Sequence, residues 1–268
     1  PDHFANEGFV AAEKLQTNDY IVRTGTTSTT RSTLSDDLVR LCAWVATEGH
    51  YHGGQTVRLC QSPTANATYS NEIDTLVARC GGNRIKGSSR LSVWSIAGDL
   101  AALIRLLMPD KVPSPELWCR LSVHQARLFM YEVARGDGNW AHVDGPLPPP
   151  PKKFWRSLQN FFHHSTVRIW QSDLRRREAF QVIATLGGLP AKALEQDALG
   201  RWGLSMSGHR MLSNVGQLSR TQITVPMVWC PHTTSGCWIA RRCGTVFVTG
   251  NSHPVDAILY PLSVLYPA

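Results

Sequence analysis

Residues 44–51 of the chain read WVATEGHY, and residues 131–140 read YEVARGDGNW. Each stretch is the end of an apolar run with helical spacing, and each closes on an acid followed by glycine: Glu48 in the first stretch and Asp137 in the second. Glycine commonly ends helices. The sequence therefore predicts two helices that end in the same way, each with a carboxylate in its last turn.

The sequence that follows these two helices also occurs twice. TVRLCQS at 56–62 returns as TVRIWQS at 166–172, with five of seven positions identical. NEIDTLVARCGG at 71–82 and EAFQVIATLGG at 178–188 are of the same helical type, and both end on Gly-Gly. The pattern predicts an α+β fold built from a tandem αββαββα repeat. The proline-rich insertion GPLPPPPKKFW at 145–155 is placed in a hairpin loop of the second copy.

Polar residues mark the expected helix starts. Ser35 precedes two aspartates and an apolar-periodic run, and Ser122 opens the helix that ends at Asp137. Asp99 is expected to cap the helix DLAALIRLLMP at 99–109, because its side chain can accept from free backbone amides.

Composition points to an anionic partner. Among 268 residues there are 27 Lys or Arg and 20 Asp or Glu, so the formal net charge is +7, and the isoelectric point is about 9.2. This balance favours a polyanionic partner, and the alternative is a merely soluble basic protein. The seven cysteines are irregularly spaced, which argues against a disulfide framework and for a reducing cytosol. We expect no membrane span, because the run LAALIRLLMP is too short and carries a charge.

The two acids suggest a shared metal site. If equivalent helices pack side by side, Glu48 and Asp137 meet at a pseudo-twofold axis within one monomer. Neighbouring carboxylates repel and need a cation or a proton. Hard oxygen ligands suit Mg²⁺, and Mg²⁺ between paired acids is typical of phosphodiester hydrolysis. The alternative is that each acid ends its helix at a solvated turn, but the repeat favours the metal site. Small residues permit close helix approach: Ala43, Ala46, Ala134 and Gly136.

The repeated strands supply candidate DNA contacts. Alternation puts the apolar residues of each strand on one face and the polar or aromatic residues on the other. Arginine on the open face can bind guanine or phosphate, and the alternative is an ordinary half-buried sheet with a solvated arginine. The candidates are Arg58, Cys60, Ser62, Arg168, Trp170 and Ser172.

The helix stretches LVRLCAWVATEGHY and QARLFMYEVARGDGNW resemble the two signature helices of LAGLIDADG homing endonucleases, of the kind embedded in inteins. The resemblance implies two pseudo-symmetric αββαββα repeats over residues 34–220, repeat one at 34–110 and repeat two at 118–220, after a linker at 25–33. It implies that the acids closing the two helices are catalytic metal ligands. It also implies antiparallel sheets that form a basic saddle on DNA, and Mg²⁺-dependent double-strand cleavage.

The flanking segments resemble the two parts of the split all-β Hint splicing domain that surrounds such endonucleases. Residues 1–24 resemble its N-terminal part, truncated before the first splicing block. Residues 221–251 resemble its C-terminal part, and residues 252–268 then belong to the downstream host protein, the C-extein. The residues that this resemblance assigns to splicing are His3, Cys230, Thr249, Gly250, the cyclising Asn251 and the acyl-accepting Ser252.

Three functions follow as hypotheses. The first is site-specific, metal-dependent DNA cleavage in the cytoplasm of a bacterial or phage-infected cell. The second is DNA binding by a catalytically degenerate intein remnant. The third is self-processing through the Hint domain alone. Retention of both acids favours the first over the second, and a missing N-terminal nucleophile counts against the third. A zinc site in the C-terminal segment is a weaker alternative, because the spacing lacks a paired C-x-x-C; its ligands would be Cys230, His232, Cys237 and Cys243.

Overall fold

In the computed structural model the chain divides into two compact units. Residues 26–209 form the larger unit, and residues 1–25 combine with residues 210–268 in the smaller one. The larger unit is therefore inserted in the sequence of the smaller. The residues that the structure describes are 16–24, 32–64, 67–87, 90–140, 166–207, 212–214 and 237–250.

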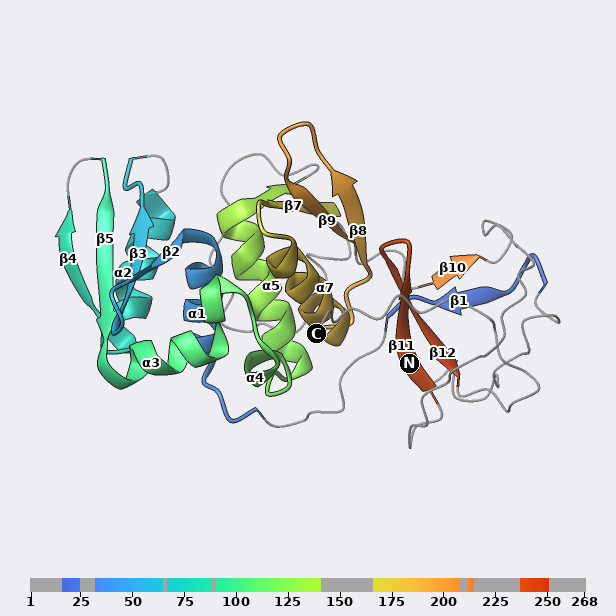
Figure 1. Cartoon of the computed structure of the whole chain (residues 1–268), viewed down its shortest axis with the longest axis horizontal. Helices are drawn as coiled ribbons and strands as arrows, with labels where there is room; N and C mark the ends of the chain where they lie inside the picture. The colour runs from blue at the N-terminus through green and yellow to red at the C-terminus, as the bar shows by residue number, and fades with distance from the viewer. Residues whose placement is uncertain are drawn as a thin grey trace. The chain divides into compact units, whose positions relative to one another are not determined.

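The first half of the larger unit contains three helices and an antiparallel sheet with strand order β2-β3-β5-β4. Figure 1 shows this half in blue to green. Its elements are α1 (Asp36–Glu48), β2 (Gly49–His52), β3 (Thr56–Gln61), α2 (Ala67–Arg79), β4 (Asn83–Gly87), β5 (Ser92–Ala97) and α3 (Gly98–Leu107).

The second half repeats the order of elements. It comprises α5 (Val123–Asp137), β6 (Gly138–Trp140), β7 (Thr166–Gln171), α7 (Leu174–Leu186), β8 (Ala191–Gln196) and β9 (Trp202–Ser207). Its strands run β6-β7-β9-β8, all antiparallel, so each half places its fourth strand beside its second. The 3₁₀ turn η3 (Pro109–Lys111) and α4 (Pro115–Trp118) join the halves. The segment expected to hold a third helix of the second copy lies outside the described residues.

The helix ends explain the paired acid-glycine dipeptides. Gly49 and Gly138 are the C-cap residues, and each begins a strand directly. A Cβ on Gly49 would lie 2.5 Å from the carbonyl oxygen of Val45, and one on Gly138 would collide with the carbonyl of Ala134. Glycine is thus required for close packing where helix turns into strand. The preceding acids are left at the last helical position, at equivalent places in both halves.

The helix starts confirm two of the three expected caps. Ser35 accepts a hydrogen bond from the amide of Leu38 at 3.2 Å, and Ser122 forms a reciprocal capping box with Gln125. The prediction for Asp99 is wrong, because α3 begins at Gly98 and its N-cap is Ala97, two residues before Asp99. Gly98, with φ of +63°, lets β5 turn straight into the helix, so Asp99 falls in the first turn.

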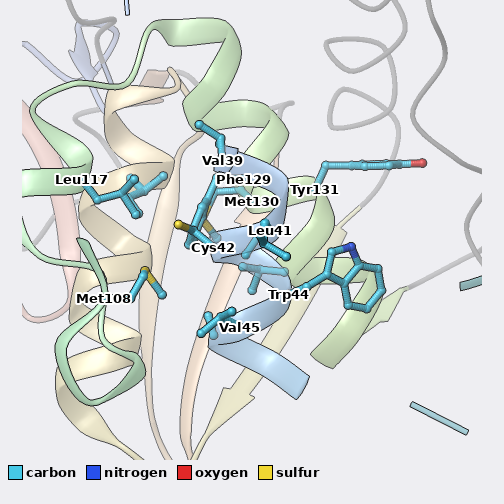
Figure 2. Close-up of a cluster of buried hydrophobic side chains, with 14 of the residues drawn as sticks. Val39, Leu41, Cys42, Trp44, Val45, Met108, Leu117, Phe129, Met130 and Tyr131 are labelled. Carbon is cyan, nitrogen blue, oxygen red and sulfur yellow. The ribbon is translucent and has the colours of Figure 1, made fainter. Parts of the chain in front are cut away.

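The core of the larger unit lies around α1 and α5. Figure 2 shows α1 side chains such as Val39 and Leu41 gathered with Phe129 and Met130 of α5. All four are fully buried, as are Trp44 and the inward residues of both sheets. Burying each large apolar side chain contributes about 1.5–3 kcal/mol, so this interface stabilises the pairing of the two halves.

Every described element of the smaller unit is a strand. β1 (Tyr20–Val22) pairs with β10 (Leu212–Asn214), and β11 (Cys237–Arg242) pairs with β12 (Thr245–Gly250), all antiparallel. Two of the residues assigned to splicing, Thr249 and Gly250, are the last two of β12 and pair with Trp238 and Cys237. The others, His3, Cys230, Asn251 and Ser252, lie outside the described residues.

Candidate metal and DNA site

The helices α1 and α5 pack in parallel, so their acids end at the same place. Near the starts of both helices, the side-chain amide of Gln125 donates to the carbonyl of Leu34 at 2.8 Å and to Asp36 Oδ1 at 2.9 Å. Near their ends, a Cβ on Gly136 would lie only 2.6 Å from Thr47 Oγ1. The close approach that small residues predicted is therefore present, beside the two acids that terminate the helices.

Burial and mutual repulsion make it unfavourable for both acids to be ionised. Burial raises the pKa of Glu48 from 4.5 to about 7, and the charge of Asp137 adds to that rise. Burial also raises the pKa of Asp137. Two carboxyls that share a desolvated space in this way require a proton or a cation.

A matched pair of glutamines contacts the acids. Gln171 Nε2 donates to Asp137 Oδ2 at 2.8 Å, and a hydrogen bond from Gln61 lowers the pKa of Glu48. The strand register places both glutamines alike. Gly49, after the first acid, pairs with Leu59, and Gly138, after the second, pairs with Ile169; each partner lies two residues before the glutamine of its strand. Gln61 and Gln171 were not predicted as site residues, although both copies of the TVR strand end in Gln-Ser.

Lys111 lies within electrostatic reach of both acids and was missed from sequence. Its charge lowers the pKa of Glu48 and of Asp137. Burial lowers the pKa of Lys111 itself, and the two acids oppose that effect. The residue comes from η3, in the junction between the halves. Asp110 and Lys111 have φ of +52° and +65°, a left-handed conformation that is uncommon outside glycine and often marks functional sites.

A second cation approaches from α7. Arg176 Nη1 donates to Gln171 Oε1 at 3.1 Å, and its charge lowers the pKa of Asp137. In the run of arginines at 175–177, Arg175 is exposed, Arg176 is half-buried beside the acid and Arg177 is buried. An α-helix cannot present three consecutive residues to one side.

In β3 the predicted DNA contacts lie on the face opposite the core. Arg58 and Cys60 are half-buried and alternate with the fully buried Val57 and Leu59. Arg58 is paired in register with His50 of β2, whose Nδ1 lies 3.9 Å from Cys60 Sγ. His50 was not predicted as a site residue. It adds a polar group to this open face, within the strand that starts directly after Glu48.

In β7 the corresponding face is shaped differently. Arg168 is exposed, and the Trp170 ring lies close to Gly203 of β9, where a Cβ would meet the ring at 2.8 Å. The guanidinium of Arg201 lies 5.9 Å from the centre of the Trp170 ring. The two serines behave alike: Ser62 and Ser172 both follow their strands rather than lying within them.

Other classes of site are not seen in the described residues. Among them no three His, Cys, Asp or Glu side chains cluster so as to hold a metal. Of the described helices, none has both the length and the apolar character required to cross a bilayer. Two ligands of the alternative zinc site, Cys230 and His232, lie outside the described residues, and within the described residues the paired acids are the metal-binding candidate.

No family model matches the sequence, and no curated protein matches it either. Among solved structures, the chain is similar to mesophilic variants of the homing endonuclease I-DmoI, with 11% identity, a TM-score of 0.42, and coverage of 64% of this chain and 88% of that one. For I-DmoI in complex with DNA and Mn the values are 10%, 0.43, 66% and 92%. For the N-terminal LAGLIDADG domain of DUF199/WhiA they are 9%, 0.37, 64% and 75%.

Proposed function

We propose that this chain is a LAGLIDADG-type endonuclease that makes a metal-dependent double-strand cut at a specific site in DNA. Glu48 and Asp137 are its metal-holding acids. The observation that carries the proposal is their placement: two desolvated carboxyls end neighbouring parallel helices, and each is contacted by the glutamine at the equivalent position of its own repeated strand. A solvated helix end would show neither the burial nor the paired contacts.

The donor set fits a hard divalent cation such as Mg²⁺. Carboxylate oxygens are preferred ligands, and Mg²⁺ takes only one or two from the protein, leaving the rest to water and phosphate. Burial and then repulsion from Asp137 raise the pKa of Glu48, and a divalent cation would offset both effects. When bound, such an ion activates water and neutralises charge on the scissile phosphate.

The chain's own residues then hold and orient the two carboxylates. Gln61 fixes the carboxylate rotamer of Glu48 by a hydrogen bond, and Gln171 does the same for Asp137. Lys111, half-buried next to both acids, supplies a positive charge where negative charge develops on a phosphate. Two acids from two halves suit the two strands of a duplex, so one monomer serves both cuts.

DNA binding is assigned to the open faces of the two sheets. Arg58 and Arg168 occupy equivalent positions there and can contact phosphate or guanine. Cys60 and Trp170 occupy the next equivalent pair, so the two halves present different surfaces. We therefore expect a non-palindromic target.

The smaller unit is proposed to be an intein splicing domain. Its support is that both ends of the chain build one compact unit whose described elements are strands, with the larger unit inserted between them. His3, Cys230 and Asn251 would carry the splicing chemistry, with Ser252 as acyl acceptor. Expression of the chain with its flanking gene segments, followed by mass spectrometry, tests this: a ligated product without the chain is expected, and an intact precursor contradicts it.

The endonuclease proposal is tested with the amide variants Glu48→Gln and Asp137→Asn. The protein is offered a plasmid library with randomised inserts in Mg²⁺, and linearised molecules are sequenced to define the target. Each amide should abolish double-strand cleavage of that target while DNA affinity stays within about three-fold, since affinity comes mainly from phosphate contacts. Glu116→Gln, an exposed acid on α4, is the matched control. If the unmutated protein binds a target but never cuts it, the chain is a DNA-binding remnant instead.

A further inference from the structure

A cluster of four charged residues, of which Glu132 and Arg135 are buried and Arg40 and Glu72 are half-buried, ties α5 to α1 and α2. Glu132 of α5 is fully buried; its Oε1 accepts from Arg40 Nε of α1 at 2.6 Å, and its Oε2 accepts from Arg135 Nη1 at 2.8 Å. Arg135 Nη2 donates to Glu72 Oε1 of α2 at 2.9 Å, and Arg40 Nη2 lies 3.7 Å from Glu72 Oε2. These four residues, Arg40, Glu72, Glu132 and Arg135, are called the interhelix charge cluster.

Aromatic rings hold the cluster from the side. The guanidinium of Arg135 lies 4.5 Å from the ring centre of Tyr69 and 5.7 Å from that of Trp44. The two rings are themselves in contact, with centroids 5.7 Å apart. Arg135 is thereby fixed by two carboxylates and two ring faces, so it has little freedom to follow a displaced partner.

The interhelix charge cluster does not follow the repeat, although the acids Glu48 and Asp137 do. When the two helices are aligned on Glu48 and Asp137, the positions of Glu132 and Arg135 correspond to Ala43 and Ala46 in α1, and that of Arg40 corresponds to Phe129 in α5. The cluster can therefore form only between one α1 and one α5. A pairing of α5 with a second α5 would leave Glu132 buried without Arg40, which is strongly unfavourable.

The position of the cluster suits it to control the acids. Glu132 lies five residues before Asp137, and Arg40 lies eight residues before Glu48, which correspond to about 7.5 Å and about 12 Å along their helices. If α1 slid by one turn along α5, the charges of Arg40 and Glu132 would separate inside the core. Buried polar groups are best attested as devices that fix helix register in this way.

We propose that the interhelix charge cluster sets the axial register of α1 against α5 and so holds Glu48 opposite Asp137. Glu132 acts as a positioning residue, not a metal ligand. This role rests on the proposed endonuclease function. Near the acids the buried apolar residues of the two helices are small, namely Ala43, Ala46 and Ala134, and contacts between small residues resist sliding weakly.

The test compares Glu132→Gln with Arg127→Met. Arg127 is buried on the same helix, but its Nε donates to the carbonyl of Gly187 at the end of α7 at 2.6 Å, so it ties α5 to a different neighbour. Both variants should lower the free energy of unfolding. Only Glu132→Gln should raise the Mg²⁺ concentration for half-maximal cleavage, by about ten-fold, as expected when the support of a metal ligand is lost. It should also leave more nicked than linear plasmid.

A crystal structure of Glu132→Gln gives a readout that is independent of activity. We expect the distance between the Cα atoms of Gly136 and Thr47 to change, with α1 displaced along its axis. An unchanged register overturns the proposal, as does a Mg²⁺ requirement altered equally in Arg127→Met. If Glu132→Gln does not fold, the double variant Arg40→Gln, Glu132→Gln replaces the charge pair by amides that can still bond. Absence of cleavage by the unmutated protein would refute the endonuclease function but leave the register measurement decisive.

Discussion

Gly136→Ala tests whether the separation of the two helices controls the acids. The new Cβ would lie 2.6 Å from Oγ1, 2.8 Å from Cβ and 3.0 Å from Cγ2 of Thr47. In an open helix, alanine in place of glycine stabilises by about 1 kcal/mol. Here the clash opposes that gain, and overpacking a tight contact costs about 1–3 kcal/mol. We expect a net loss of about 1 kcal/mol in the free energy of unfolding.

Thr47 cannot move aside easily. It is β-branched, so its χ1 is restricted in a helix, and its hydroxyl donates towards the carbonyl of Trp44 at 3.3 Å. The strain is therefore relieved by moving α1 away from α5, next to the acids. Because a misplacement of about 1 Å can cost about 100-fold in rate, we expect cleavage to fall far more than stability does.

The assay pairs urea unfolding with single-turnover cleavage of the selected target. Gly54→Ala is the control, since its Cβ would meet nothing within 4 Å. The compensating variant Gly136→Ala, Thr47→Gly removes all three clashing atoms and should recover most of the cleavage rate without exceeding the stability of the unmutated protein. If Gly136→Ala is more stable than the unmutated protein and cuts equally well, the close approach has no role in placing the acids.

Three further outcomes follow from the site. Without divalent metal, the free energy of unfolding should fall by about 1–3 kcal/mol as pH rises from 5 to 8, because folded Glu48, with a pKa of about 7, keeps a proton that the unfolded chain has lost. Addition of Mg²⁺, or the substitution Glu48→Gln, should abolish most of that fall. Identical pH profiles of urea unfolding with and without the substitution would contradict this prediction. Lys111→Met should lower the cleavage rate at least about ten-fold while DNA affinity in a gel-shift assay changes little, and an unchanged rate would remove Lys111 from the site. DNA affinity, measured by fluorescence anisotropy, should fall steeply between low and moderate salt through release of counterions from the phosphates; a flat curve would count against an arginine-lined DNA surface.

The sequence predicted the elements of the site well because their signals are local. Helical spacing and the flanking serines defined α1 and α5, and the acid-glycine ends followed from the steric demand where each helix turns into a strand. The repeated TVR strands were also found correctly. These features depend on neighbours a few residues apart, which a single sequence contains.

The cations of the site could not be predicted for the opposite reason. Lys111 stands in a proline-rich junction with no periodic pattern, and its approach to both acids depends on how the two halves pack. Arg176 belongs to a run of three arginines, and only the packing of α7 on the second sheet decides which of them faces Asp137. The same holds for Glu132, whose partner Arg40 is 92 residues away. Long-range electrostatics leaves little trace in local sequence.

The balance of charges around the acids favours a reversible metal site over a permanent ion pair. Lys111 and Arg176 both lower the pKa of Asp137, yet burial raises it by more, so the cations do not fully compensate the carboxyls. The direct hydrogen bond to Asp137 comes from neutral Gln171, while Arg176 bonds the far side of that glutamine. Had an arginine paired with the acid directly, a bidentate bond would have satisfied it and left nothing for a metal. Because neutral amides contact the carboxylates and the cations lie behind them, the negative charge of the carboxylates is not fully neutralised. A divalent ion would then add the positive charge that a DNA phosphate requires.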